Sequence, residues 1–503
     1  TIEIDIVKNS PQEEVSDSHP RVLNVEIDFE NSADNNQPPL PEPEENQPPN
    51  TDEEPPVETI DEPYPVVEQP EEKPEEEQPQ SEETGEPLEA VLKSKSNELN
   101  KVLLEMYPEL QSKFDKYKKG VNACYDTHVT ANLSVNIFQD KVNSIIEKFF
   151  KETDNSFKNA SQAEIEERVQ VVVENFHELA ELLLKCAQQH AKGKPTMKLG
   201  LSEISFYSHQ ETKTRLFSHP QSASPEPPQL APGEERIFQT LGRHEPDFSK
   251  ERNLSALAPK FRTFCNIKPI AGDKPIPREF NWVQQTFVSP VVNQGFQCDA
   301  GYVMAATAAL ESQYMMRTGE KRKPTILSAQ ATLHCMAGGC KGGSLASPIR
   351  FMVKHGAPLA GLAPYTGSAS QSQCYTGYPY AVQAEDTCFF SWLKEAEMQR
   401  LVLRNGPASV PLDASARDFR YLKNSPYLGP CSSKRTNHAA LLVGWTAQYW
   451  LIKNSFGENW GTKGYLYLPR GQSQYTNKCG IQTDFAQPII RSIKTKKQWL
   501  KSV

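Results

Sequence analysis

The sequence contains no run of about 18 apolar residues, so it predicts no membrane-spanning helix. It also lacks histidine and cysteine groups with the spacing of metal ligands; the adjacent His334 and Cys335 are better explained as a helix end beside a disulfide. The basic residues are dispersed, and no nucleic-acid-binding motif accompanies them. We therefore predict no membrane segment, no metal or other cofactor, and no nucleic-acid partner.

Basic residues are almost absent from residues 1–88, which hold 27 Asp and Glu against 3 Lys and Arg, a net charge of −24. Subtracting these from the 64 acids and 54 bases of the whole chain leaves 37 acids and 51 bases in residues 89–503. Proline, glutamate and other polar residues dominate the acidic segment, which cannot bury enough apolar surface to offset its ordering entropy. We interpret it as a disordered acidic tail that acts either as an interaction arm or as a solvated spacer.

Apolar periodicity begins after this tail. Apolar residues recur at helical spacing over 92–110 and 138–149, and a third helix is predicted over 161–190, where acids occupy the first turn. Further on, a proline-rich stretch precedes a region where helical and strand-like patterns mix, as in one α+β domain. The predicted segments are the tail 1–88, a helical region 89–215, a linker 216–274, an α+β domain 275–490 and a basic C-terminal tail 491–503.

Four separated blocks in the predicted α+β domain carry motifs in the order and spacing of one protein family. They are VSPVVNQG at 288–295, LSAQ at 327–330 with CKGG at 340–343, NHA at 437–439, and WLIKNSFG at 450–457. Through these blocks the domain resembles the papain-like, cathepsin-type cysteine peptidases. The resemblance implies a two-lobed papain-like fold with a helical left lobe, a β-barrel-like right lobe and a peptide-binding cleft between them.

A second resemblance lies in the helix predicted over 161–190. Papain-family peptidases carry a helical inhibitory propeptide with a spaced Glu, Arg, Phe, Asn, Ile, Asn signature, and some of its positions are matched here. An amphipathic helix alone would also give the apolar part of this pattern, but its place before the peptidase-like domain favours a propeptide-like region that docks on the cleft. The six positions are Glu164, Arg168, Val172, Asn175, Leu179 and Leu183.

The nucleophile position of the resembled family is occupied by glycine. The family signature has a second cysteine at the start of a helix, and the corresponding stretch is CDAGY at 298–302, which puts Gly301 in its place. His438 lies 137 positions after Gly301, and Asn454 lies 16 after His438, so they match the catalytic base and its orienting amide. Gln294 matches the oxyanion-hole glutamine. Because glycine has no atom that attacks a carbonyl, we predict the fold without the peptidase chemistry.

The resemblance also assigns substrate-binding positions. Gly342 and Gly343 match the glycine pair along which a substrate backbone lies, and Trp460 belongs to the last family motif. These three residues are the implied substrate-binding residues.

Two departures from the family pattern surround the retained positions. Phe456 replaces the tryptophan that shields the His–Asn bond, and Phe296 and Gln297 stand where the family has one residue. We expect the extra residue to displace the side chain of Gln294. We also expect Gly301→Cys to create a thiol that reacts rapidly with active-site reagents, with weak or absent peptide turnover.

The ten cysteines could be buried thiols or disulfides, and the resemblance favours disulfides. Three disulfides imply an oxidising compartment, so the protein is expected to be secreted or endolysosomal. An alternative makes Cys298 a displaced nucleophile, although it lies three residues before the expected position. The implied pairs are Cys298 with Cys340, Cys335 with Cys374 and Cys431 with Cys479, and Cys124, Cys186, Cys265 and Cys388 remain unassigned.

Three functions remain open at the level of the sequence. The preferred one is a non-catalytic papain-family homologue whose cleft binds peptides, partner proteins or its own propeptide-like region, in a decoy or regulatory role. The second is an active cysteine endopeptidase. The third is a structural or matrix protein that binds through the acidic tail.

Overall fold

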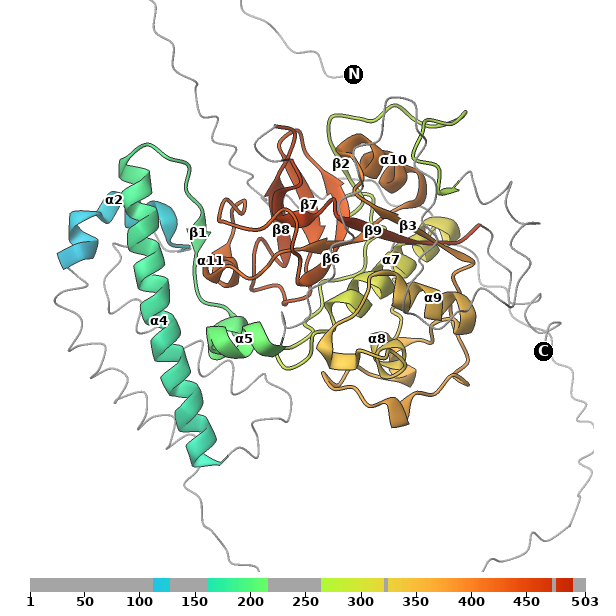
Figure 1. Cartoon of the computed structure of the whole chain (residues 1–503), viewed down its shortest axis with the longest axis horizontal. Coiled ribbons are helices and arrows are strands. Elements are labelled where there is room, and N and C mark those ends of the chain that lie inside the picture. The colour runs from blue at the N-terminus through green and yellow to red at the C-terminus, as the bar shows by residue number, and fades with distance from the viewer. Residues whose placement is uncertain (1–111, 127–160, 216–263, 321–323, 473–475, 492–503) are drawn as a thin grey trace, which may run out of the picture. The chain divides into compact units, whose positions relative to one another are not determined.

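The computed structural model describes residues 112–126, 161–215, 264–320, 324–472 and 476–491 (Figure 1). The predicted acidic tail, the helices predicted over 92–110 and 138–149, most of the linker and nearly all of the basic C-terminal tail lie outside the described residues.

A long helix dominates the described part of the helical region, where the sequence predicts one over 161–190. A shorter helix packs closely against it, because Gly120 has no side chain. A Cβ at this position would lie 2.7 Å from the Cα and carbonyl oxygen of Ala187. The elements of this region are α2 (Lys118–Cys124), α4 (Gln162–Ala191), β1 (Lys198–Leu199), the short 3-10 helix η1 (Glu203–Phe206) and α5 (His209–Arg215).

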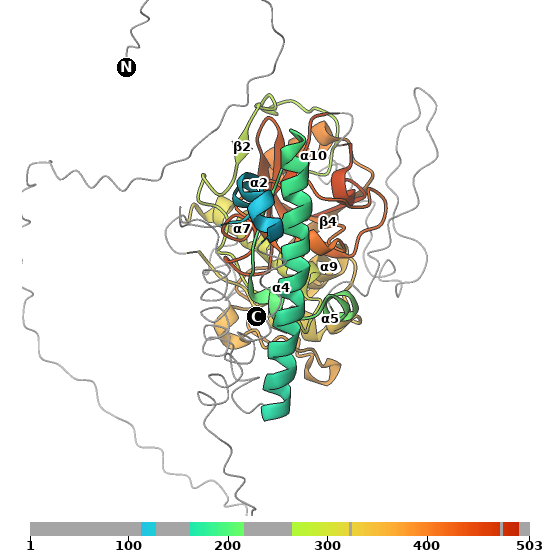
Figure 2. The ribbon, with the colours of Figure 1, turned by 90° about the vertical axis from the view of Figure 1, so that its left-hand side faces the viewer.

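The apolar side of α4 faces the peptidase-like domain. Val172, Phe176, Leu179 and Leu183 are buried at the three- and four-residue spacing of one helix face. They belong to the same hydrophobic core as the side chains of the large sheet. Figure 2 shows α4 lying along the rest of the described structure.

The large sheet of the C-terminal domain is antiparallel, with the strand order β3-β9-β4-β6-β7-β8 and with β2 paired to β6. It is open, because its two edge strands β3 and β8 are not paired with each other; the barrel-like right lobe expected from the sequence is therefore a twisted open sheet. Separately, β1 pairs with β5. The strands are β2 (Phe280–Asn281), β3 (Asp386–Ser391), β4 (Ala408–Leu412), β5 (Leu422–Lys423), β6 (His438–Trp445), β7 (Tyr449–Lys453), β8 (Tyr465–Pro469) and β9 (Asp484–Ile489).

A buried helix packs against this sheet and against the helices of the other lobe. It begins at Gly301 and ends before Gly319, whose positive φ of 75° suits glycine. Its side chains contribute to two apolar clusters, one with the neighbouring helices and one with the sheet. The helices of the domain are α7 (Gly301–Thr318), α8 (Ala329–His334), η4 (Gly339–Lys341), α9 (Ala346–His355), η5 (Ala360–Leu362), η6 (Gln371–Gln373), α10 (Glu395–Asn405), α11 (Arg417–Arg420) and η8 (Lys478–Gly480).

Two elements therefore place the candidate site. The N-terminus of α7 lies beside the start of β6, which sits between β4 and β7 in the sheet. Every residue of β6 is buried, so its first side chain is held in the interior. The structure thus brings Gly301 and His438 together, as the sequence predicts.

Candidate active site

His438 and Asn454 form a hydrogen-bonded pair. The imidazole Nε2 lies 2.8 Å from the amide Oδ1 of Asn454, and the ring of Phe456 stacks on the imidazole with 4.8 Å between centroids. His438 is 0% exposed. Burial lowers its pKa to about 4, against a smaller raising effect of the bond to Asn454, so the imidazole is neutral at neutral pH.

The imidazole fills the space that a side chain at Gly301 would need. A Cβ built on Gly301 would lie 2.8 Å from Cε1 of His438 and 3.0 Å from both its Nδ1 and the carbonyl oxygen of Ala439. Real Cβ atoms do not approach other heavy atoms as closely as 2.8 Å, so the imidazole would have to shift. The start of α7 therefore carries no attacking atom, and a side chain there would require the imidazole to move.

Gln294, the predicted oxyanion-hole residue, is turned into the protein. Its Nε2 donates to the carbonyl oxygen of Cys298 at 3.1 Å, and the hydroxyl of Ser455 donates to its Oε1 at 2.5 Å. The side chain is completely buried. The amide is thus held by its own chain, with one N–H already used.

The inserted pair Phe296 and Gln297 follows Gln294 closely in the chain, and the ring of Phe296 lies inside the protein. Phe296 is buried and packs on Phe456 with 5.8 Å between ring centroids. Its other neighbour is Tyr207 of the helical region, at 5.2 Å. Together with His438 these rings form an aromatic row that runs from the helical region to the imidazole. The sequence signals the insertion but not the packing of the inserted ring.

The predicted substrate-binding residues fall into two classes. Gly342 has a φ of 87°, which favours glycine, and a Cβ at Gly343 would lie 2.7 Å from the ring of Tyr302. Trp460, in contrast, is fully buried, and its Nε1 donates to the carbonyl oxygen of Phe419 at 2.9 Å. Trp460 is therefore part of the core and offers no surface to a ligand.

The sequence does not predict the buried lysine next to Asn454, whose charge interacts with the buried carboxyl of Glu311. The ammonium of Lys453 donates to the backbone and side-chain oxygens of Ser289, at 2.8 and 3.0 Å. Burial lowers its pKa to about 8, and the carboxylate of Glu311 opposes this shift. The signal was a lysine in the otherwise apolar run WLIK. These hydrogen bonds tie β7 to the segment around Ser289.

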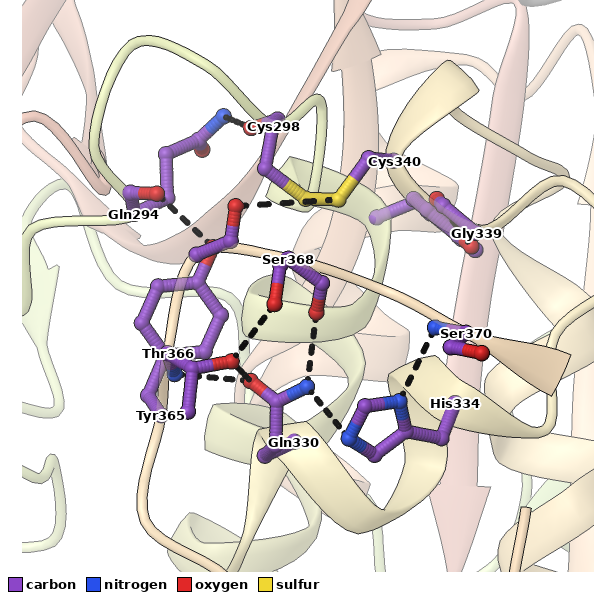
Figure 3. The surroundings of a disulfide bond; sticks show 12 residues. Gln294, Cys298, Gln330, His334, Gly339, Cys340, Tyr365, Thr366, Ser368 and Ser370 are labelled. Atoms are coloured by element: carbon purple, nitrogen blue, oxygen red, sulfur yellow. Dashed lines mark hydrogen bonds between the residues drawn. A yellow bond between two sulfur atoms is a disulfide. The ribbon is translucent and has the colours of Figure 1, made fainter. Parts of the chain in front are cut away.

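All ten cysteines lie in disulfides. The three implied pairs are present, and Figure 3 shows the one between Cys298 and Cys340 beside Gln294. Two pairs were not assigned from the sequence. They are Cys124 with Cys186, which joins α2 to α4, and Cys265 with Cys388, which ties the end of the linker to β3.

The propeptide-like positions form their own network. Arg168 makes two hydrogen bonds to Glu211 of α5, at 2.7 and 3.0 Å, and Asn175 donates to the carbonyl oxygens of Ser205 and Tyr207, at 2.7 and 2.9 Å. These polar residues hold the 203–207 turn against α4. The side chain of Glu164 is not among those that the structure describes.

The helical region is also bonded to the domain. The guanidinium of Arg420 donates to the carbonyl oxygens of Ile204 and Tyr207, and to Glu178 at 3.3 Å. The hydroxyl of Tyr421 donates to Glu178 at 2.9 Å. Arg420 is 0% exposed, so these partners, in place of water, stabilise its positive charge.

Neither a metal site nor a membrane span is found in the part of the chain that the structure describes. There, no three His, Cys, Asp or Glu side chains are grouped so as to hold a metal ion. No helix in the same residues is long and apolar enough to cross a membrane.

Comparison with known proteins gives one family. Residues 276–489 match the family model described as papain family cysteine protease. Among curated proteins, the chain is 34% identical over 233 residues to Testin-2 of Rattus norvegicus, 31% over 220 residues to papain of Carica papaya, and 32% over 229 residues to procathepsin L of Mus musculus. Each match covers 43% of this chain and 62–66% of the relative, less than two thirds of its length.

Solved structures extend the likeness of fold beyond that domain. Procathepsin L 3 from the larval midgut of Tenebrio molitor is 21% identical with a TM-score of 0.52, and the match covers 70% of this chain and 99% of that one. The proform of the ragweed pollen allergen Amb a 11, a cysteine protease, is 20% identical with a TM-score of 0.51, over 74% of this chain and all of that one. At this identity the likeness concerns the fold alone.

Proposed function

Residues 276–489 match the papain family cysteine protease model, and we propose that this domain is catalytically inactive and serves as a binding module. The observation that carries the proposal is the contact between the start of α7 and His438. Gly301 has no nucleophilic atom, and the imidazole lies where a cysteine side chain would stand. Removing the nucleophile of a comparable triad lowers turnover about 10⁶-fold.

The state of the retained residues supports the same proposal. A general base needs a pKa near the working pH and access to the proton that it takes. His438 is buried and its pKa is about 4. The amide of Gln294 is bonded to Cys298 and Ser455. These groups stabilise the domain and are unsuited to proton transfer or to an oxyanion.

The alternative of an active cysteine peptidase would need another thiolate. Cys298 is bonded to Cys340, and no cysteine is free; all ten of the chain lie in the described residues. A disulfide sulfur cannot act as the thiolate nucleophile. We therefore do not favour this alternative.

We further propose that the helical region is a permanent component of the binding module. Val172, Phe176 and Leu179 share the core of the domain. Arg420 would be left as a buried, unpaired cation if the 203–207 turn and α4 departed. Five disulfides favour an oxidising, secreted or endolysosomal location.

The test is an activity assay on the purified full-length chain. It is incubated with a broad mixture of peptide substrates and with a thiol-reactive, peptide-based active-site probe, and papain serves as the positive control. We expect no cleavage by mass spectrometry and no covalent labelling without reductant. Cleavage that the probe abolishes, together with labelling of one cysteine, would show that the domain is an active peptidase.

A further inference from the structure

One aromatic ring stands out on the surface of the peptidase-like domain. Of the large apolar and aromatic side chains that the structure describes, Tyr375 is the most exposed, at 57%. Its ring meets that of Tyr378 edge to face, with 4.8 Å between centroids. It also covers the backbone of Gly377, where a Cβ would lie 2.5 Å from the hydroxyl oxygen and 2.7 Å from Cζ of Tyr375. Two neighbours therefore hold the ring while much of it faces solvent.

The loop that carries this ring is tied to α8. Cys374, the residue before Tyr375, forms a disulfide with Cys335, which directly follows the last residue of α8. A few residues earlier, the backbone N–H of Ser370 donates to Nδ1 of His334 at 3.1 Å (Figure 3). A ring that the free protein already holds in place loses little conformational freedom when a ligand binds to it.

The segment around the ring is polar but uncharged. Residues 356–384 contain no Asp, Glu, Lys, Arg or His. They do present hydroxyl and amide groups, which both donate and accept hydrogen bonds. The exposed ones are Thr366, Ser368, Gln371, Ser372, Gln373 and Thr376. A charged ligand would find no opposite charge in this segment, and a purely apolar ligand would take water from these groups without replacing its hydrogen bonds.

A neutral sugar has the complementary chemistry. One face of a pyranose ring presents C–H groups, whose partial positive charge suits the negative face of an aromatic ring. The hydroxyls around that face pair with uncharged donors and acceptors. We propose that Tyr375 is the stacking surface of a binding site for a neutral oligosaccharide. This site lies on a different loop from Gly301 and His438, so the inference goes beyond the proposed function and does not depend on it.

The test is saturation-transfer NMR on the purified full-length chain, with chitohexaose, mannohexaose and maltohexaose as probes. Saturation of the protein should pass to the C–H protons of one sugar face in at least one probe, and titration of that probe should saturate. Tyr375→Ala should weaken binding about tenfold, whereas Tyr375→Phe should keep it within about twofold because the ring remains. The matched control is Leu359→Ala, which removes another exposed apolar side chain of the same domain and should leave binding unchanged.

Wild-type protein alone gives a second readout, which is decisive even if Tyr375→Ala fails to fold. Because neither the sugar nor the loop is charged, the affinity should be the same at low and at high NaCl concentration. A steep fall in affinity with salt would overturn the inference, since charged groups would then hold the probe. It would equally be overturned if none of the three probes received saturation, or if Tyr375→Ala and wild type bound the probe alike. Peptide cleavage by the protein would contradict the proposed function and leave this inference standing.

Discussion

At the scale of single residues, the absence of a side chain at Gly301 lets the imidazole of His438 lie close to the start of α7. In a working peptidase of this kind, the imidazole must face a thiol and a substrate. Here the imidazole of His438 lies against the α-carbon of Gly301, stacked on Phe456 and bonded to Asn454. Under the proposed function, His438 is a packing group.

This geometry revises the expectation for Gly301→Cys. The new Cβ would meet Cε1 of His438 at 2.8 Å, and the ring cannot swing freely because it is buried and stacked. We expect the variant to be destabilised by about 1–3 kcal/mol, the usual cost of overpacking. The introduced thiol should be alkylated no faster than free cysteine, contrary to the rapid reaction expected from the sequence. Denaturant unfolding and alkylation kinetics measure the two effects.

A double-mutant cycle tests whether His438 causes the loss of stability in Gly301→Cys. In a His438→Ala background, Gly301→Cys should cost much less stability, because the imidazole that the new side chain would overlap has been removed. An equal cost in both backgrounds would show that His438 is not the obstacle. Rapid alkylation that His438→Ala abolishes would instead show a site ready for catalysis.

The burial of His438 also predicts a dependence of stability on pH. The unfolded chain takes up a proton near pH 6.5, whereas the folded chain does so only near 4. Stability should therefore fall as the pH drops from 6.5 to 4, and the wild type should lose about 2 to 3 kcal/mol between pH 7 and pH 4.5 through this group. His438→Gln should remove that loss in denaturant titrations at the two pH values. His190→Gln, at an exposed position of α4, should leave it unchanged.

At the scale of elements, α11 and α4 are joined by charges of very different burial. Arg420 and Arg417 both pair with Glu178, but the side chain of Arg420 is 1% exposed and that of Arg417 is 63% exposed. Only Arg420 also holds the carbonyl oxygens of the 203–207 turn. The contact of Arg420 with Glu178 is therefore a buried ion pair, whereas that of Arg417 is a surface ion pair.

We therefore expect unequal effects of two similar substitutions. Arg420→Ala should lower the free energy of unfolding by about 3–5 kcal/mol, since it strands a partly buried carboxylate and unbonded carbonyl oxygens. Arg417→Ala should cost less than about 1 kcal/mol, as for an exposed pair. Denaturant unfolding of both variants at one pH makes the comparison. If both variants lost a similar free energy of unfolding, Arg420 would contribute no more than Arg417 to the attachment of α11 to α4.

The elements also show what the sequence could predict. The helix over 161–190 follows from the pattern of the sequence, and the meeting of Gly301, His438 and Asn454 is implied by the resemblance to the papain family. The closed site could not be foreseen, because it depends on the contact of an imidazole with a missing side chain 137 residues away. The inserted Phe296 was visible, but its packing on Tyr207 is a long-range contact that no local pattern encodes.

At the scale of the whole molecule, one core spans the helical region and the peptidase-like domain. Phe176 and Leu183 of α4 belong to the same cluster as Met398 and Trp445 of the domain. No disulfide crosses between them, because Cys124 with Cys186 is internal to the helical region and the other four pairs lie in residues 265–479. The association is entirely non-covalent apart from the chain itself.

This predicts the behaviour of a cut chain. If a site for a sequence-specific protease is placed within 216–263 and cleaved, the two pieces should co-elute in size-exclusion chromatography without denaturant. In denaturant they should separate even without reductant. Pieces that separate under native conditions at micromolar concentration would contradict a permanent helical component.

The contact between Gly301 and His438 also has an evolutionary consequence. A glycine codon is one nucleotide from a cysteine codon, so a cysteine at position 301 is a single mutation away. The folded protein opposes that step, since a side chain at this position strikes an imidazole that now belongs to the core. Reversion would first need a permissive change that moves His438 aside, and such a change brings no catalytic benefit by itself. If the proposed function is right, packing therefore opposes the return of a nucleophile at Gly301.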